Sequence, residues 1–306
     1  MNKAALIIST IAGGLLVATT GSAQVGIRAS TSVARQSPPA QEQEIVVQGQ
    51  RRAVMRQLHA MIARDTGDQL ARFEDRLCPI VIGMPRDLTA AMTRMIRANI
   101  ESFGAKLEPV GCRPNGLVIF IDQPRELVEA IRKEQPDLLG MEPREASNFV
   151  ADVGAISSWH ITETRGVEGE TLGNYDAGAM GSSKAKVTRS VTTSRLYSPA
   201  RQEMMLGFVV IDRGRTVGHN LRQLSDLATM HLLLEIRASA ATKDPNSILS
   251  LFEPRGEGDA VPQSLSRIDR GAMAGFYAQR QNNLTAAQQR SNIVRAIEAG
   301  AGEKKK

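Results

Sequence analysis

The middle of the chain alternates between short apolar runs and longer segments in which apolar residues recur every three or four positions. Short apolar runs are typical of buried strands, and the longer spacing is typical of helices that pack on one side. The predicted strands cover residues 79–83, 106–110, 117–121, 158–164, 186–197 and 204–212. The predicted helices cover residues 51–73, 87–103, 124–131, 141–153, 217–237 and 266–278. This alternation predicts an α/β (or α+β) fold, a mixed sheet with packed helices.

The N-terminus has the three parts of a secretory signal peptide. Lys3 supplies a positive charge, residues 4–18 form a short apolar core, and small residues follow up to Ala23. The alternative is an uncleaved membrane anchor, but the apolar run is shorter than the roughly 20 residues of a spanning helix. No later segment is apolar enough to span a membrane. We therefore expect cleavage after Ala23 and a periplasmic or secreted protein.

The region after the signal peptide is polar. Residues 24–50 are rich in Ser, Gln, Ala and Pro and predict a disordered tether. Within it, Glu44-Ile45-Val46-Val47 is β-prone and resembles the TonB box of outer-membrane TonB-dependent receptors, although no transmembrane barrel follows. The resemblance implies a docking peptide for TonB-linked uptake, and the alternative is a stray edge strand.

The remaining chain divides into three parts. Residues 51–77 form an amphipathic helical lead-in, residues 78–278 a single α/β domain, and residues 279–306 a polar C-terminal tail with a loosely attached helix. The loop at residues 166–183 is rich in Gly, and a loop of that length is usually functional or mobile.

Composition narrows the possible functions. Aromatic residues make up only 4%, so the core must be mostly aliphatic and Met. The net charge is +6, but Lys and Arg are spread along the chain, which argues against nucleic-acid binding. Cys78 and Cys112 both follow the signal peptide, and an even count in an exported chain favours a disulfide over two free thiols.

The junction at residues 218–224 carries the one motif that points to metal chemistry. Zincin peptidases have an edge strand that leads into a helix with the sequence H-E-x-x-H, whose His residues bind Zn²⁺ and whose Glu is the general base. Here the corresponding frame is H-N-x-x-Q: His219 stands at the first ligand position, Asn220 replaces the Glu and Gln223 replaces the second His.

Two later segments follow in the order found in zincins. Residues 245–250 resemble the P-S-I-M-S turn beneath the metal, with Leu249 in place of Met. Residues 264–269, Ser-Leu-Ser-x-x-Asp, resemble the start of the helix that closes such domains. Over residues 78–278 the chain thus resembles a degenerate zincin-like fold, as in uncharacterised secreted families related to metallopeptidases. The resemblance implies a cleft between the strand at 204–212 and the helix from Val217.

The substituted residues argue against catalysis. Asn220 is not ionisable and cannot accept a proton from a metal-bound water. Gln223 is a weak neutral Zn²⁺ ligand, and His231 lies about 18 Å from His219 along a helix, so they cannot share an ion. Ser158 and His160 share one face of a strand with Trp159 on the other, but no third group orients the His.

The sequence therefore predicts a pseudoenzyme: an exported, non-catalytic domain without catalytic residues, cofactor or metal, which binds an unknown envelope protein or peptide. His219 remains the one candidate metal ligand. The first alternative is a divergent zinc-dependent peptidase, and the second is an accessory to TonB-linked uptake.

Overall fold

A computed structural model describes residues 40–62, 69–176, 184–187, 197–237, 244–256, 258–280 and 283–300. The predicted signal peptide (residues 1–23), residues 24–39 of the predicted tether and most of the predicted strand at 186–197 lie outside the described residues. The strands are β1 (Pro79–Ile82), β2 (Gly116–Ile121), β3 (Ile156–Gly166), β4 (Gly173–Asp176), β5 (Lys184–Val187) and β6 (Ala200–Asp212). The α-helices are α1 (Ala40–Met61), α2 (Arg86–Ser102), α3 (Pro124–Glu134), α4 (Pro143–Ala151), α5 (Leu221–Leu233), α6 (Arg267–Tyr277) and α7 (Ala286–Glu298).

Four strands form one mixed sheet in the order β1-β2-β6-β3. The first three are parallel, and β3 pairs antiparallel with β6 from Ile156↔Ile211 to Gly166↔Ala200. The inner strands β2 and β6 carry apolar runs at residues 117–121 and 204–211, because strands covered on both faces need apolar side chains on both. Strands β4 and β5 form a separate antiparallel pair. The predicted α/β class with a mixed sheet is confirmed.

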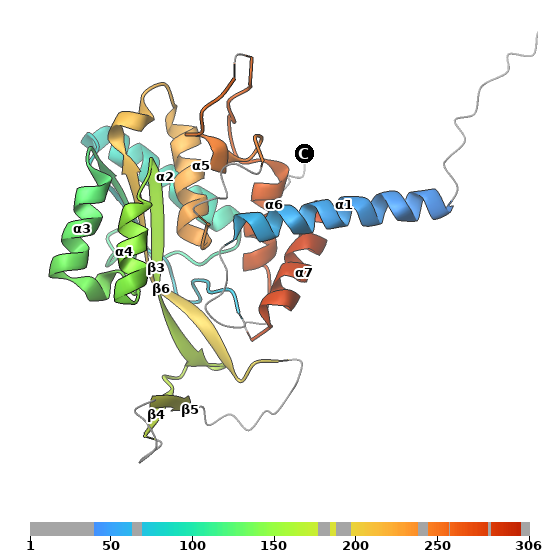
Figure 1. Cartoon of the computed structure of the whole chain (residues 1–306), viewed down its shortest axis with the longest axis horizontal. Coiled ribbons are helices and arrows are strands. Elements are labelled where there is room, and N and C mark those ends of the chain that lie inside the picture. Colours follow the sequence, from blue (N-terminus) through green and yellow to red (C-terminus); the bar gives the residue numbers. More distant parts are fainter. Residues whose placement is uncertain are drawn as a thin grey trace, which may run out of the picture. The chain divides into compact units, whose positions relative to one another are not determined.

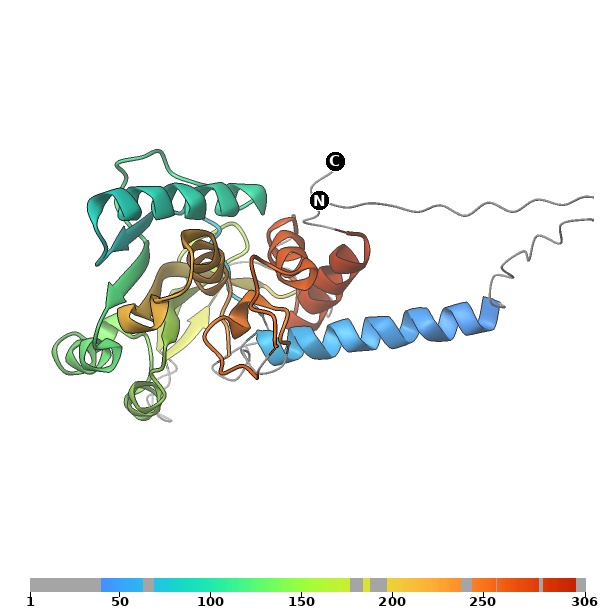
Figure 2. The same cartoon turned by 90° about the horizontal axis from the view of Figure 1, so that it is seen from above.

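Helices cover both faces of this sheet (Figures 1 and 2). On one face, Val118 of β2 and Val209 of β6 belong to the main core with residues of α2 and α5. On the other face, Val210 and Phe208 pack in a second cluster with residues of α3 and α4. Alternate residues of β2 and β6 thus enter different cores, as the pleat of a strand requires.

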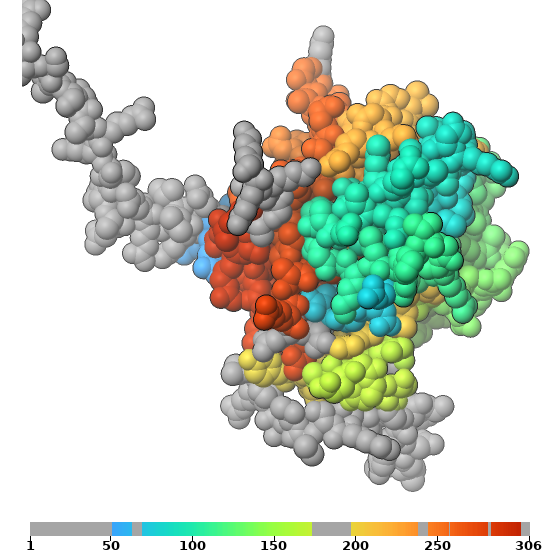
Figure 3. All heavy atoms as spheres, turned by 180° about the vertical axis from the view of Figure 1, so that it is seen from behind, coloured from blue at the N-terminus to red at the C-terminus, as the bar shows by residue number. Residues whose placement is uncertain are grey.

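The main core extends beyond the predicted domain of residues 78–278. In α1, Leu58 is fully buried, and in α7, Ile293 and Ile297 are fully buried. Close contact between α6 and α7 depends on two glycines: a Cβ at Gly271 would lie 2.7 Å from the side chain of Ile297, and Gly275 is equally close to α7. The expectation of a loosely attached tail was wrong, because α7 supplies core residues. Seen from behind, α2 (teal) and the α6–α7 pair (red) form adjoining parts of the surface (Figure 3).

Two predictions of secondary structure were also wrong. Residues 44–47 lie within α1, so the predicted tether does not extend to residue 50 and no edge strand forms at residues 44–47. Only Ile45, Val46 and Val47 are β-prone, and they are flanked by Gln, Glu, Arg and Ala, which favour a helix. The predicted strand at 106–110 is reduced to a single bridge between Leu77 and Leu107. Pro109 lies two residues after Leu107 and has no N–H group for a ladder.

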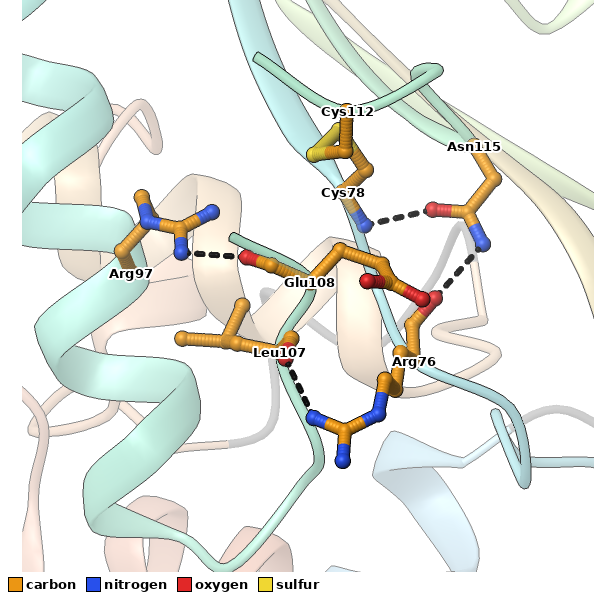
Figure 4. Close-up of a disulfide and its surroundings, with 7 residues drawn as sticks. All are labelled: Arg76, Cys78, Arg97, Leu107, Glu108, Cys112 and Asn115. Atoms are coloured by element: carbon orange, nitrogen blue, oxygen red, sulfur yellow. Dashed lines mark hydrogen bonds between the residues drawn. A yellow bond between two sulfur atoms is a disulfide. The ribbon is translucent and has the colours of Figure 1, made fainter. Parts of the chain in front are cut away.

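A disulfide joins Cys78, beside β1, to Cys112, with a distance of 6.0 Å between the two Cα atoms. Figure 4 shows Asn115 next to it, where its side chain accepts a hydrogen bond from the Cys78 N–H at 2.7 Å and donates one to the Arg76 carbonyl at 3.2 Å. The predicted bridge is confirmed. It fixes the segment that connects α2 to β2.

Reduction of this disulfide should lower the free energy of unfolding by about 3–4 kcal/mol, because the bridge restricts the unfolded chain over the enclosed loop. Urea unfolding with and without dithiothreitol measures the change. The double variant Cys78→Ser/Cys112→Ser is the control, and dithiothreitol should not change its stability. A reductant effect of the same size on that variant would contradict the prediction.

No helix in the described part of the chain combines the length and the apolar character that crossing a membrane requires.

Candidate functional site

The residues predicted at the degenerate metal site instead form the start of α5. Asn220 is the N-cap: its side chain accepts a hydrogen bond from the Gln223 N–H at 3.0 Å, and the Gln223 side chain accepts one from the Asn220 N–H at 2.9 Å. Gln223 also donates to the Pro262 carbonyl at 2.8 Å. This reciprocal pair is a capping box, in which two otherwise unpaired N–H groups are satisfied. The frame N-x-x-Q was therefore visible in the sequence as a helix start.

His219 precedes the helix and lies near two arginines, Arg215 and Arg255. Its ring packs edge-on against Phe252, with 5.4 Å between the ring centroids. Burial lowers the pKa of His219, and the nearby guanidinium groups of Arg215 and Arg255 lower it further. The same two charges disfavour a metal cation at this position. Among the described residues, no group of three or more His, Cys, Asp or Glu side chains is placed to hold a metal ion.

The two segments that resemble zincin motifs, residues 245–250 and 264–269, are joined by the fully buried carboxyl group of Asp269. It accepts hydrogen bonds from the Ser247 hydroxyl at 2.7 Å, the Ile248 N–H at 2.9 Å and the Ser266 N–H at 2.9 Å. Burial raises the pKa of Asp269, and these hydrogen bonds oppose the rise. The carboxyl group thus joins the start of α6 to the 3₁₀ turn at Ile248–Ser250 and fixes both beside α5.

A cavity of about 1000 Å³ lies along the outer side of β3. Its walls come mainly from residues 123–126, 152–162, 231–237 and 249–254. We call it the β3 groove. The resemblance placed the cleft beside the strand at 204–212, but β6 is an inner strand with neighbours on both sides. The hollow therefore lies at β3, which is the edge strand.

Two histidines lie at the inner wall of the β3 groove, and burial keeps both neutral. The Ser158 hydroxyl lies 2.9 Å from Nδ1 of His231, and burial and the neighbouring His160 lower the pKa of His231 to about 3. Nε2 of His160 lies 2.9 Å from the Leu232 carbonyl, which can only accept, so this nitrogen carries hydrogen. Burial lowers the pKa of His160 to about 4, while this hydrogen bond opposes the shift.

The alternation predicted for β3 is confirmed, but the partner of Ser158 was missed. Trp159 points to the other face, where its ring stacks on Phe208 with 4.8 Å between centroids. The hydroxyl of Ser158 meets His231 rather than His160, across 73 positions of sequence. A single His among the apolar residues of 224–234 was the available signal for a buried histidine.

A Ser–His contact in a cavity is one part of a nucleophilic site, but the remaining parts do not follow. An imidazole with a pKa of about 3 is a weak proton acceptor near neutral pH. A third group must also orient the imidazole. In the described chain, the hydrogen bonds of these two histidines run to Ser158 and to the Leu232 carbonyl, with no carboxylate among their partners. The arrangement can hold a ligand by hydrogen bonds but is poorly suited to proton transfer.

Comparisons of the chain with models of protein families, with curated proteins and with solved structures gave no match.

Proposed function

We propose that the chain is an exported, non-catalytic binding domain, built on a degenerate zincin-like scaffold, whose ligand lies in the β3 groove. The observation that carries the proposal is the groove itself. Its volume of about 1000 Å³ is that of a ligand site, while its central polar pair, Ser158 and His231, is neutral and internally hydrogen-bonded.

The order of elements supports the scaffold. An antiparallel edge strand, β3, is followed by the inner strand β6, which leads through a short 3₁₀ turn into α5. The turn at Ile248–Ser250 and the start of α6 come next and are joined by Asp269. The signal-peptide pattern of residues 1–23 and the disulfide support export, since disulfides persist in oxidising compartments.

The two alternatives have less support. A zinc-dependent peptidase would need a general base and ligands other than Asn220 and Gln223, whose amide groups are engaged in the capping box. A role in TonB-linked uptake was motivated by an extended segment at residues 44–47, and these residues lie within α1.

Selection of peptides from a random display library on the mature protein tests the proposal. Thr162 is exposed and lines the β3 groove. The larger side chain of Thr162→Trp should therefore fill part of the groove without disturbing the packed core. We expect this variant to lose at least about tenfold in affinity for selected peptides, which is about 1.4 kcal/mol. Val110→Trp is the control, because Val110 is 88% exposed and does not line the groove.

Two results would contradict the proposal. Equal binding by Thr162→Trp and the parent protein would place the ligand elsewhere. Stoichiometric zinc in the purified protein, lost together with peptidase activity on His219→Ala, would establish the peptidase alternative.

A further inference from the structure

We propose that the ligand of the β3 groove is an extended, basic polypeptide segment, which adds as a strand to the outer edge of β3 and places Lys or Arg side chains against an acidic wall. This inference rests on the proposed function and names the class of its ligand. It depends on two properties of the groove, the direction of backbone groups at its inner wall and the balance of charges around it.

The outer edge of β3 presents backbone groups to the groove. The Asp212 N–H donates to the Ala155 carbonyl at 2.9 Å, which fixes the phase of the antiparallel ladder with β6. Because hydrogen-bonded pairs alternate in such a ladder, the backbone groups of Ile156 and Ser158 point away from β6. Both residues line the groove. An unpaired strand edge of this kind binds another extended chain through main-chain hydrogen bonds.

The edge is available only over a short stretch. At His160 the loop before α4 approaches: a Cβ at Gly140 would lie 3.7 Å from the His160 carbonyl oxygen. A ligand strand can therefore pair with the first residues of β3 and must then leave the edge. This geometry limits main-chain recognition to a few residues, so the side chains of the ligand must supply much of the remaining affinity.

The charges around the groove favour a cation. Six carboxyl groups line it, against three guanidinium groups, although the chain as a whole carries a net charge of +6. The acidic residues of the lining are Glu126, Glu145, Asp152, Asp212, Glu235 and Glu253. A groove with local charge opposite to that of the rest of the chain is an electrostatically distinct surface, and it favours ligands of positive charge.

The arginines of the lining are held in place by the protein itself. Arg125 donates to the Ala151 carbonyl at 2.9 Å, and Arg215 donates to the Phe252 carbonyl at 3.0 Å. By contrast, Asp152 and Glu253 make no ion pair with any residue that the structure describes. Both carboxylates line the groove, and a Lys or Arg side chain of the ligand can pair with them.

Four synthetic nine-residue peptides test the inference by fluorescence anisotropy with the mature protein. Three alternate Val with Lys, Gln or Glu, and the fourth is the Lys peptide with alternate backbone amides N-methylated. The Lys peptide should bind tightest, and the Glu peptide should bind at least about tenfold more weakly. N-methylation keeps the charges but removes main-chain donors, so it should also cost about tenfold or more.

Variants of the protein test whether the acidic residues of the groove cause the preference for the Lys peptide. Asp152→Asn/Glu253→Gln should weaken binding of the Lys peptide by about fivefold and leave the Gln peptide unchanged. The matched control is Glu101→Gln/Glu134→Gln, which removes two charges from exposed positions outside the groove and should change neither peptide.

The outcomes separate this inference from the proposed function. Equal affinity of the Lys and Glu peptides, or no effect of N-methylation, overturns the basic strand as ligand. If Thr162→Trp still abolishes binding of a neutral or acidic library peptide, the groove remains a binding site and only its ligand class is wrong. If Thr162→Trp changes no binding at all, the proposed function fails as well.

Discussion

Acidification from pH 7 to pH 4 should lower the free energy of unfolding by about 3 kcal/mol for His160 and by a similar amount for His231. In the folded protein the pKa of His160 is about 4 and that of His231 is about 3, against 6.5 for the exposed side chain. Between pH 6.5 and these values, the unfolded chain binds protons that the folded chain excludes. The stabilisation is therefore complete above pH 6.5 and is lost as the pH falls.

Urea unfolding at intervals between pH 4 and pH 8 measures this loss, and two replacements assign it. His160→Gln keeps a donor for the Leu232 carbonyl, and His231→Asn keeps a partner for the Ser158 hydroxyl. Each should flatten the acid side of the stability curve relative to the parent protein, and the double variant should flatten it most.

The stability of each variant at pH 8 is its own reference, because there both histidines are neutral in the folded and in the unfolded chain. If the double variant His160→Gln/His231→Asn lost stability in acid as steeply as the parent protein, the carboxyl groups would be responsible and the two histidines would not be buried neutral groups.

Replacement of Asp269 by Ala should lower the free energy of unfolding by about 4 kcal/mol. The carboxyl group is fully buried and accepts from Ser247, Ile248 and Ser266. Removal leaves two buried donors, the Ser247 hydroxyl and the Ile248 N–H, and the part-buried Ser266 N–H without this acceptor, and each buried donor left unpaired costs about 1–3 kcal/mol. The 3₁₀ turn at Ile248–Ser250 would also lose its connection to α6.

Thermal and urea unfolding of Asp269→Ala measure the effect. Asp259→Ala is the control, because Asp259 is exposed and accepts one hydrogen bond from the Gly256 N–H at 2.9 Å. It should change the stability by no more than about 1 kcal/mol. A loss below 1 kcal/mol for Asp269→Ala would show that water or another acceptor replaces the carboxyl group.

The strands and helices of the sheet could be predicted because their patterns are local. Residues 117–121 are apolar throughout, and residues 204–211 are apolar except for Gly207, which matches inner strands with both faces covered. Errors arose where a distant contact decided the outcome. The helix α7 is polar in composition, yet its few apolar residues are buried against α6 because glycines there allow close approach.

The site was predicted less well, for physical reasons that particular residues illustrate. The frame from His219 to Gln223 fits both a degenerate metal motif and a capping box, and only hydrogen-bond geometry separates them. The contact between Ser158 and His231 depends on the packing of α5 on β3, which spacing in the sequence does not report. A groove between loops leaves no periodic pattern at all.

The seam between α6 and α7 determines where the polypeptide can be shortened. A truncation at residue 278 removes Ile293 and Ile297 and uncovers the glycine-lined surface of α6 that they occupy. Such a fragment would expose apolar surface on α6, and this surface would promote self-association during expression. The smallest fragment suitable for recombinant work therefore extends at least through Glu298.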